Sequence, residues 1–180
     1  MRKRSMEELN RLSVEAFKNT KKNPFVLLLD NVRSAHNVGS AFRTADVFAI
    51  EKIVLCGITA MPPNREIAKT ALGATESVRW EHWPNSEEAV AQLKAEGYRI
   101  VIVEQAEGSV PLHRLNVGND EKVCLMFGNE VFGVDEKLFA LADACVEIPQ
   151  FGTKHSLNVS VSIGVVLWEC CRKLAASGES

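Results

Sequence analysis

The chain has 180 residues, of which 46% are hydrophobic and 24% charged, and its net charge is −2. These values are typical of one globular domain with a sizeable core, and no apolar run approaches the roughly 18 residues of a membrane span. The five cysteines form no CxxC pair and the four histidines are scattered. The sequence therefore predicts no metal site and no disulfide framework, and it favours a cytoplasmic protein with reduced thiols.

Charge is unevenly distributed along the chain. Residues 1–43 carry nine Lys or Arg and four Asp or Glu, a net of +5, whereas residues 44–180 carry a net of −7. A basic end is compatible with a phosphate-binding face. A solvated helix with a basic start explains the same charges equally well.

The alternation of helical and strand patterns predicts the architecture. Residues 1–23 are expected to form a basic N-terminal helix, because apolar side chains recur at mostly helical spacing over Ser5–Lys18. Residues 24–180 are expected to form the main domain, in which strands and helices alternate as in an α/β fold with a mainly parallel sheet and helices on both faces. The expected strands are Phe25–Leu29, Ile53–Cys56, Ser77–Trp80, Arg99–Val103, Val123–Phe127 and Cys145–Ile148, and the expected helices between them are Asn37–Phe48, Asn64–Leu72, Ser86–Glu96 and Asp135–Leu141.

The segment Ile148–Glu169 is the most informative part of the chain. A strand ends at Pro149, a polar loop follows, and the apolar residues beyond it fit both an alternating strand and a helix. The length, with Arg172 and Lys173 expected in the last turn, favours a helix capped by Ser156 or Asn158. Its N-terminus could hold a small polar ligand, although a buried helix with an ordinary cap is the simpler interpretation.

Three polar loops follow predicted strands, at residues 30–37, 128–133 and 150–158. Ligands of open α/β sheets bind beyond the carboxyl ends of the strands. The sequence contains no GxGxxG, no GxxxxGK[ST] and no GxSxG, so it does not support a dinucleotide fold, a P-loop enzyme or a serine hydrolase.

These loops resemble the three motifs of the SpoU (TrmH) family of SPOUT RNA 2′-O-ribose methyltransferases. The motifs in this chain are Asn37-Val38-Gly39-Ser40-Ala41-Phe42-Arg43, then Gly128-Asn129-Glu130 with Gly133, then Ile148-Pro149, Gly152 and Ser156-Leu157-Asn158-Val159-Ser160-Val161. One motif would be weak, but three in the right order, each after a predicted strand, are specific. The resemblance covers about residues 24–175, and Gln150 stands where many members have methionine.

The resemblance implies a SPOUT fold with a C-terminal trefoil knot and S-adenosyl-L-methionine bound in the knot. It also implies a homodimer in which the helix after the third motif packs against the partner. The cofactor-binding residues that it implies are Val103, Glu104, Gly128, Asn129, Ile148 and Leu157.

The same resemblance assigns the reaction. It implies that Arg43 is the central catalytic residue, with Asn37, Glu130, Ser156 and Asn158 around it, and that Arg33, Arg43 and Lys154 contact the RNA. A general-base role is often proposed for this arginine, but a guanidinium group is effectively always protonated. We therefore favour Arg43 as the group that holds an RNA phosphate and stabilises the developing alkoxide, with Glu130 orienting Arg43 or Asn37.

The substrate is expected to be tRNA, with a D-loop guanosine favoured by the third motif. Members that act on rRNA often carry an extra N-terminal domain, and only about 23 residues precede the first strand. The wobble nucleotide of tRNA and rRNA are the alternatives. A catalytically silent RNA-binding relative is disfavoured because Arg43 and the third motif are intact, and a small-molecule methyltransferase is disfavoured by the basic end.

Overall fold

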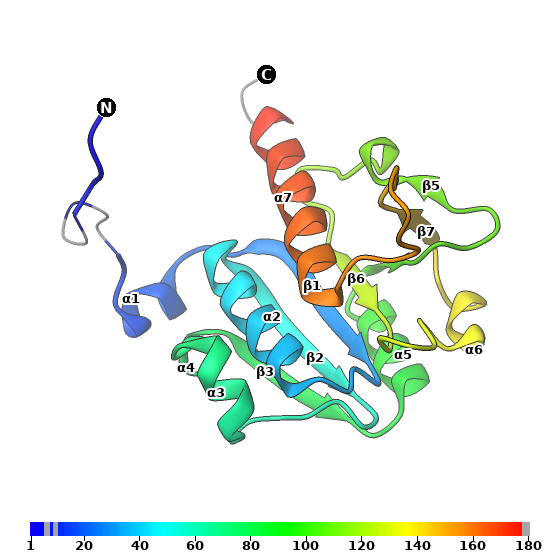
Figure 1. The fold of residues 1–180 in the computed structure, drawn as a ribbon, viewed down its shortest axis with the longest axis horizontal. Helices are drawn as coiled ribbons and strands as arrows, with labels where there is room; N and C mark the ends of the chain where they lie inside the picture. Colours follow the sequence, from blue (N-terminus) through cyan, green and yellow to red (C-terminus); the bar gives the residue numbers. More distant parts are fainter. Residues whose placement is uncertain (6–7, 9–10, 178–180) are drawn as a thin grey trace.

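The computed structural model describes residues 1–5, 8 and 11–177. Within them, seven strands form one sheet in the order β3-β2-β1-β6-β4-β7-β5, and every pairing is parallel (Figure 1). The predicted parallel sheet is confirmed. The strands are β1 (Asn23–Asp30), β2 (Ile50–Cys56), β3 (Arg79–Trp83), β4 (Arg99–Val103), β5 (Val110–Pro111), β6 (Val123–Phe127) and β7 (Ala144–Glu147).

Helices cover both faces of the sheet, as the alternating pattern predicted (Figure 1). The side chains of Phe25, Leu27 and Leu29 of β1 lie in one buried cluster with residues of α2, α3 and α7. Val26 and Leu28, which point the other way because strand side chains alternate, lie in a second cluster with residues of α5 and α6. The helices are α1 (Val14–Asn19), α2 (Ala35–Val47), α3 (Arg65–Ala71), α4 (Ala74–Ser77), α5 (Ser86–Ala95), the 3-10 helix η2 (Leu112–Arg114), α6 (Glu136–Phe139) and α7 (Val159–Ser177).

Two helix starts decide where the motif residues lie. The side chain of Ser34 accepts a hydrogen bond from Asn37 N (3.3 Å), so α2 begins two residues earlier than predicted. The side chain of Asn158 accepts one from Ser160 N (2.9 Å), so Asn158 rather than Ser156 caps α7. Both caps satisfy an otherwise unpaired N–H of the first turn.

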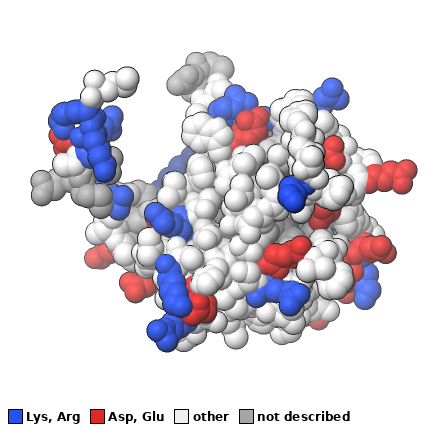
Figure 2. Space-filling view, viewed as in Figure 1, with Lys and Arg blue, Asp and Glu red and all other residues white. Residues whose placement is uncertain are grey.

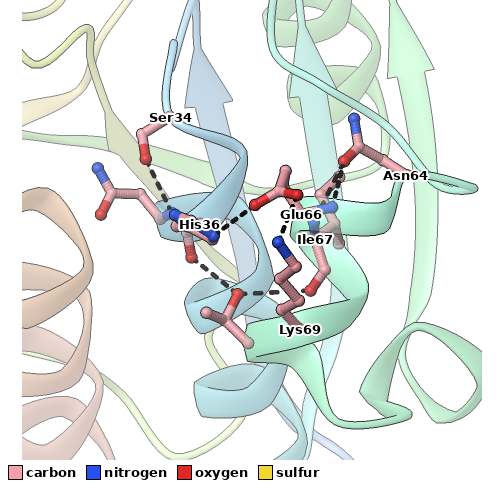
Figure 3. Close-up of polar contacts among 8 residues, drawn as sticks. Ser34, His36, Asn64, Glu66, Ile67 and Lys69 are labelled. Atoms are coloured by element: carbon pink, nitrogen blue, oxygen red, sulfur yellow. Dashed lines mark hydrogen bonds and ion pairs between the residues drawn. The ribbon is translucent and has the colours of Figure 1, made fainter.

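Helix α3 fixes the start of α2 (Figure 3). The side chain of Glu66 on α3 contacts His36 Nε2 at 2.8 Å and Lys69 Nζ at 2.6 Å, and Asn64 caps α3 through the backbone N–H groups of Glu66 and Ile67. Because His36 precedes Asn37 directly, these contacts also hold the first turn of α2 that carries Asn37.

The predicted N-terminal helix over Ser5–Lys18 is wrong in its extent. Among the described residues of this range, the α-helix is confined to α1, which is capped by Ser13, whose side chain accepts from Ala16 N at 3.1 Å. Leu12 lies outside the helix and is 56% exposed, and Phe17 is the buried residue of α1. A helical pattern alone does not fix a helix when its apolar side chains have no surface to bury. Positions 6, 7, 9 and 10 of the expected helix lie outside the described residues.

Two smaller boundaries also differ from the predictions. Ser77 ends α4 instead of starting a strand, because its hydroxyl binds the Asp46 carboxylate of α2 (2.5 Å) and the Ala74 carbonyl. Helix α7 continues past Arg172 and Lys173 to Ser177, so these cations do not lie in its last turn. Lys173 instead bonds carbonyl groups around η2, including that of His113 at 3.0 Å.

Candidate active site at the carboxyl edge of the sheet

A hollow of about 410 Å³ lies at the carboxyl ends of β4, β6 and β7 and below the loop that leads into α7. All six predicted cofactor residues line it, together with three of the predicted catalytic residues. The six are Val103, Glu104, Gly128, Asn129, Ile148 and Leu157, and the three are Glu130, Ser156 and Asn158. Parallel strands bring these loops together because their carboxyl ends meet at one edge of the sheet.

A chain of hydrogen bonds connects the three motifs beside this hollow. Asn37 Nδ2 donates to Glu130 Oε1 at 2.9 Å, and Asn158 Nδ2 donates to Asn37 Oδ1 at 3.2 Å. The Glu130 carboxylate also accepts from the backbone N–H groups of Arg33 (2.9 Å) and Ser34 (3.0 Å). Residues more than 90 positions apart in the sequence are thereby fixed in one polar cluster.

The environment of Glu130 keeps its carboxyl ionised. Partial burial acts to raise its pKa, but the hydrogen bonds from Arg33 N, Asn37 and Ser34 N favour the charged form and lower its pKa below the ordinary value. The carboxylate is therefore a fixed acceptor that is already engaged, and its role in this geometry is to orient Asn37 and the loop before α2.

The loop 128–133 is held in one conformation by its own backbone and by Asn129. Asn129 and Gly133 exchange two backbone hydrogen bonds of 2.9 Å. Asn129 Oδ1 accepts from the N–H groups of Val131 and Phe132, and its Nδ2 donates to Asn31 O at 2.8 Å. A Cβ at Gly128 would lie 2.2 Å from the backbone of Gly133, so glycine is required for this close approach.

The structure does not bring the predicted RNA-binding cations to the lining of this hollow. Arg43 is exposed and lines a different hollow, of about 770 Å³, between α1, α2 and α4. Arg33 lines a third hollow, together with Ile58 and Phe132, and Lys154 is an exposed residue of the loop before α7. The catalytic role of Arg43 stays a prediction.

The described residues contain no group of three or more His, Cys, Asp or Glu side chains arranged to hold a metal ion. In the same part of the chain, no helix is long and apolar enough to cross a membrane.

The family model of the SpoU rRNA methylase family matches residues 24–168, which include all three motifs. The chain belongs to this family. The resemblance predicted from the motifs is therefore confirmed.

Several relatives of this SpoU protein carry a named activity. It is 29% identical to the tRNA (guanosine(18)-2′-O)-methyltransferase of Thermus thermophilus, over 97% of this chain and 88% of the relative. It is 30% identical to the 23S rRNA (guanosine-2′-O-)-methyltransferase RlmB of Neisseria meningitidis, over 92% of this chain but only 65% of that protein. An uncharacterized tRNA/rRNA methyltransferase of Borreliella burgdorferi is 32% identical over 89% of this chain and 69% of its own length.

Solved structures support the fold of this SpoU protein. The TrmH/SpoU tRNA modifying enzyme of A. aeolicus matches with a TM-score of 0.80 and 25% identity, over 92% of this chain and 84% of that one. The AdoMet-bound rRNA methyltransferase of Sinorhizobium meliloti matches with a TM-score of 0.78 and 30% identity, over 88% of this chain and 60% of that one.

Sequence reasoning missed several residues that line the hollow of this SpoU protein, among them Gln105 and Glu147. Gln105 lines the hollow, and its Nε2 donates to His155 O at 2.9 Å, which ties the loop before α7 to the end of β4. Glu147 also lines the hollow and accepts from Ser109 Oγ at 2.9 Å. A polar side chain directly after a buried strand was the available signal for Gln105, the same signal that identified the other loops.

Proposed function

We propose that this protein transfers a methyl group from S-adenosyl-L-methionine to a ribose 2′-hydroxyl of RNA. The observation that carries the proposal is the polar chain Asn158–Asn37–Glu130 at the edge of a hollow that the residues of the second and third motifs line. Membership of the SpoU family and the named activities of the relatives support the same reaction.

The lining of the hollow fits this cofactor. The side chains of Val103, Phe127, Ile148 and Leu157 offer an apolar wall to a purine, whereas Glu104 and Glu147 offer carboxylates to cationic amino and sulfonium groups. The six predicted cofactor residues would hold the molecule, which when bound supplies a methyl group activated for nucleophilic attack.

The residues of the chain then have to position the ribose and manage its proton. A ribose hydroxyl is a poor nucleophile, so alignment and charge stabilisation are required. Glu130 orients Asn37, and Asn37 and Asn158 direct polar groups toward the hydroxyl. Arg43 holds a phosphate and stabilises the alkoxide, and the proton leaves to phosphate or water.

A homodimer completes this arrangement. Helix α7 exposes Val161 (51%), Val165 (38%) and Trp168 (62%), which recur at positions i, i+4 and i+7 on one helical face. Burying this face against a second copy removes it from water. Because Arg43 lines a hollow apart from the cofactor residues of its own chain, it acts at the pocket of the second copy.

The C-terminal chain forms a trefoil knot in this proposal. Strand β7 lies between β4 and β5, which both precede it in sequence. The chain leaving β7 leads into α7, which packs on α2 and on η2. Lys173 Nζ binds the carbonyl oxygens of Leu112 and His113. In the proposed knot, residues 148–158 pass through the loop formed by residues 104–122. This path accounts for the position of β7 between β4 and β5.

The substrate is tRNA, with a D-loop guanosine favoured. The relative from Thermus thermophilus, which this chain matches over 88% of that protein, is named for that reaction. The wobble nucleotide or rRNA is the alternative.

Figure 2 shows Lys and Arg side chains gathered on the N-terminal segment at the upper left of this face, which suits contacts with phosphates. The free cysteines suit the reducing cytoplasm, where tRNA is found.

Two measurements test the function. Calorimetry should detect S-adenosylhomocysteine binding to the wild type. Leu157→Arg should abolish it, because Leu157 lines the hollow, whereas Phe151→Arg in the same loop should not, because Phe151 is 97% exposed and not part of the lining. Mass spectrometry of tRNA and rRNA nucleosides should then reveal one 2′-O-methyl mark that depends on the protein. If neither ligand binding nor a mark is found, the methyltransferase proposal is wrong.

A further inference from the structure

A second hollow, of about 590 Å³, lies next to the cofactor hollow and is lined by residues that follow β1, β2 and β6. The two hollows share Asn129 and Gly133 in their walls. Two large apolar side chains in the lining of the second hollow are exposed to solvent, Phe132 to 85% and Ile58 to 69%. An exposed aromatic ring next to a site that acts on RNA has the chemistry to stack on an unpaired base.

The ring of Phe132 is presented by a fixed backbone rather than by a free loop. Phe132 N donates to Asn129 Oδ1 at 3.2 Å, and Asn129 Nδ2 is itself bound to Asn31 O. Ile58 N donates to Asn31 Oδ1 at 3.2 Å, so the opposite wall is tied to the same residue. The backbone positions that carry the two apolar side chains are therefore fixed before any ligand binds, which lowers the entropic cost of binding.

The polar groups of this hollow limit which base fits. Asp30 is buried, and its carboxylate is engaged by Ser86 Oγ, Asn31 Nδ2 and Asp135 N. Asp135 and Glu136 are exposed on the wall; Asp135 Oδ1 accepts from Lys137 N, and the described residues provide no partner for Glu136. Ionised carboxylates only accept hydrogen bonds. Among the four RNA bases, guanine alone presents adjacent N–H donors, N1–H and the N2 amino group, on one edge.

We propose that this hollow binds the guanine base of the nucleotide that is methylated. The base stacks on Phe132 beside Ile58, its N1–H and N2 amino group donate to Asp135 and Glu136, and its ribose reaches the cofactor hollow across the 128–133 loop. Arg33, which lines the same hollow, faces the adjoining phosphate. This inference rests on the proposed function, because it names the base that the same site accepts.

Binding titrations test the stacking part without requiring turnover. The probes are a tRNA transcript that the wild type binds, with S-adenosylhomocysteine present, and the variants Phe132→Ala and Phe132→Trp. Loss of one base–aromatic stack should weaken RNA affinity about tenfold in Phe132→Ala, and tryptophan should restore it. Met61→Ala is the matched control, because Met61 is 49% exposed but does not line the hollow. Affinity for S-adenosylhomocysteine should be the same in all four proteins.

Base identity is tested with a tRNA that carries inosine in place of the methylated guanosine, since inosine lacks only the N2 amino group. The wild type should bind the inosine RNA several-fold more weakly and methylate it more slowly. The double variant Asp135→Asn, Glu136→Gln should lose most of this difference, because an amide can also donate to the base.

Different results would overturn different claims. Equal RNA affinity of the wild type and Phe132→Ala, or equal binding of guanosine and inosine RNA, would overturn the base-binding inference while methyl transfer persists. A Phe132→Ala protein of half the wild-type molar mass would identify the patch as a subunit interface instead. If the wild type discriminates guanosine from inosine but transfers no methyl group, the proposed function fails and the base site stands.

Discussion

Glu130 is the residue on which the polar cluster depends. Its carboxylate accepts hydrogen bonds from two backbone N–H groups and from Asn37, and an uncharged side chain cannot accept all three equally well. The amide group of glutamine can accept through its oxygen but not through its nitrogen.

We expect Glu130→Gln to lower the free energy of unfolding by about 1 kcal/mol, a value reduced for the exposure of the side chain. Methyl transfer should slow by at least about tenfold, because Asn37 loses its orientation. Urea unfolding and single-turnover assays measure the two effects. Glu107→Gln changes an exposed carboxylate outside the cluster and should alter neither the free energy of unfolding nor the rate of methyl transfer. If Glu107→Gln lost as much stability and activity as Glu130→Gln, the role of Glu130 would be contradicted.

The lowered pKa of Glu130 also predicts a pH dependence. The native pKa lies below the ordinary value of 4.5, so the carboxylate stabilises the fold above about pH 4.5 and this contribution is lost as the pH falls through the native pKa. The stability difference between the wild type and Glu130→Gln should be constant near neutral pH and should shrink below about pH 4.5. A difference that grew on acidification would contradict the sign of the pKa shift.

Substitution of Arg43 tests whether methyl transfer can be lost without loss of cofactor binding. We expect Arg43→Ala and Arg43→Lys both to slow methyl transfer by at least about a hundredfold, because lysine cannot grip a phosphate with a planar fork. Cofactor affinity should stay at the wild-type value, since Arg43 does not line the cofactor hollow. Single-turnover assays at saturating cofactor, together with binding titrations, check this. Near-full activity of Arg43→Lys would rule out the bidentate contact.

At the scale of elements, the close contact of α2 with α3 holds the first motif in place. A Cβ at Gly39 would lie 2.1 Å from Thr70 Oγ1 and 2.4 Å from Ile67 O, which is backbone and cannot rotate away. Thr70 Oγ1 also donates to His36 O at 3.0 Å. The glycine of the NxG sequence in the first motif, Gly39, is therefore explained by packing between two helices.

We expect Gly39→Ala to destabilise the protein by about 2 kcal/mol, because the helices must separate to admit the methyl group. Gly164→Ala is the matched control on α7, where a Cβ would meet nothing within 4 Å; within a helix it should stabilise by up to about 1 kcal/mol. Urea unfolding of both variants should give opposite signs. Equal effects would mean that helix propensity, rather than packing, decides the outcome at Gly39.

At the scale of the whole molecule, the exposed face of α7 is the surface that the proposed homodimer buries. We expect Trp168→Arg to convert the proposed dimer to a monomer, because a charge replaces the largest and most exposed apolar side chain of this face. Light scattering after size exclusion measures the molar mass, and methyl transfer should fall with it because Arg43 then lacks a partner pocket. Met61→Arg, at an exposed apolar residue on another surface, should leave the molar mass unchanged. A wild type that is monomeric would contradict the homodimer directly.

The sequence by itself predicted six of the seven strands, the helices α2, α3, α5, α6 and α7, and most of the residues that line the cofactor hollow, but not β5, α4 or η2. Strands β1, β4 and β6 lie in the predicted places because buried parallel strands need continuous apolar runs, and Arg99–Val103 and Val123–Phe127 match to the residue. Five of the six predicted cofactor residues meet because they end or follow strands of one parallel sheet, and the sixth, Leu157, lies in the loop between β7 and α7.

Tertiary structure decided what local patterns could not. Of the helix expected at Ser5–Lys18, the described residues contain only α1, where Phe17 is buried while the neighbouring Leu12 and Val14 are exposed. The choice between Ser156 and Asn158 as the cap of α7 was settled by the contact of Asn158 with Asn37, 121 positions away. The positions of Arg43 and Phe132 were equally hidden from the sequence, because the direction of an exposed side chain depends on which elements pack beside it and not on its own spacing.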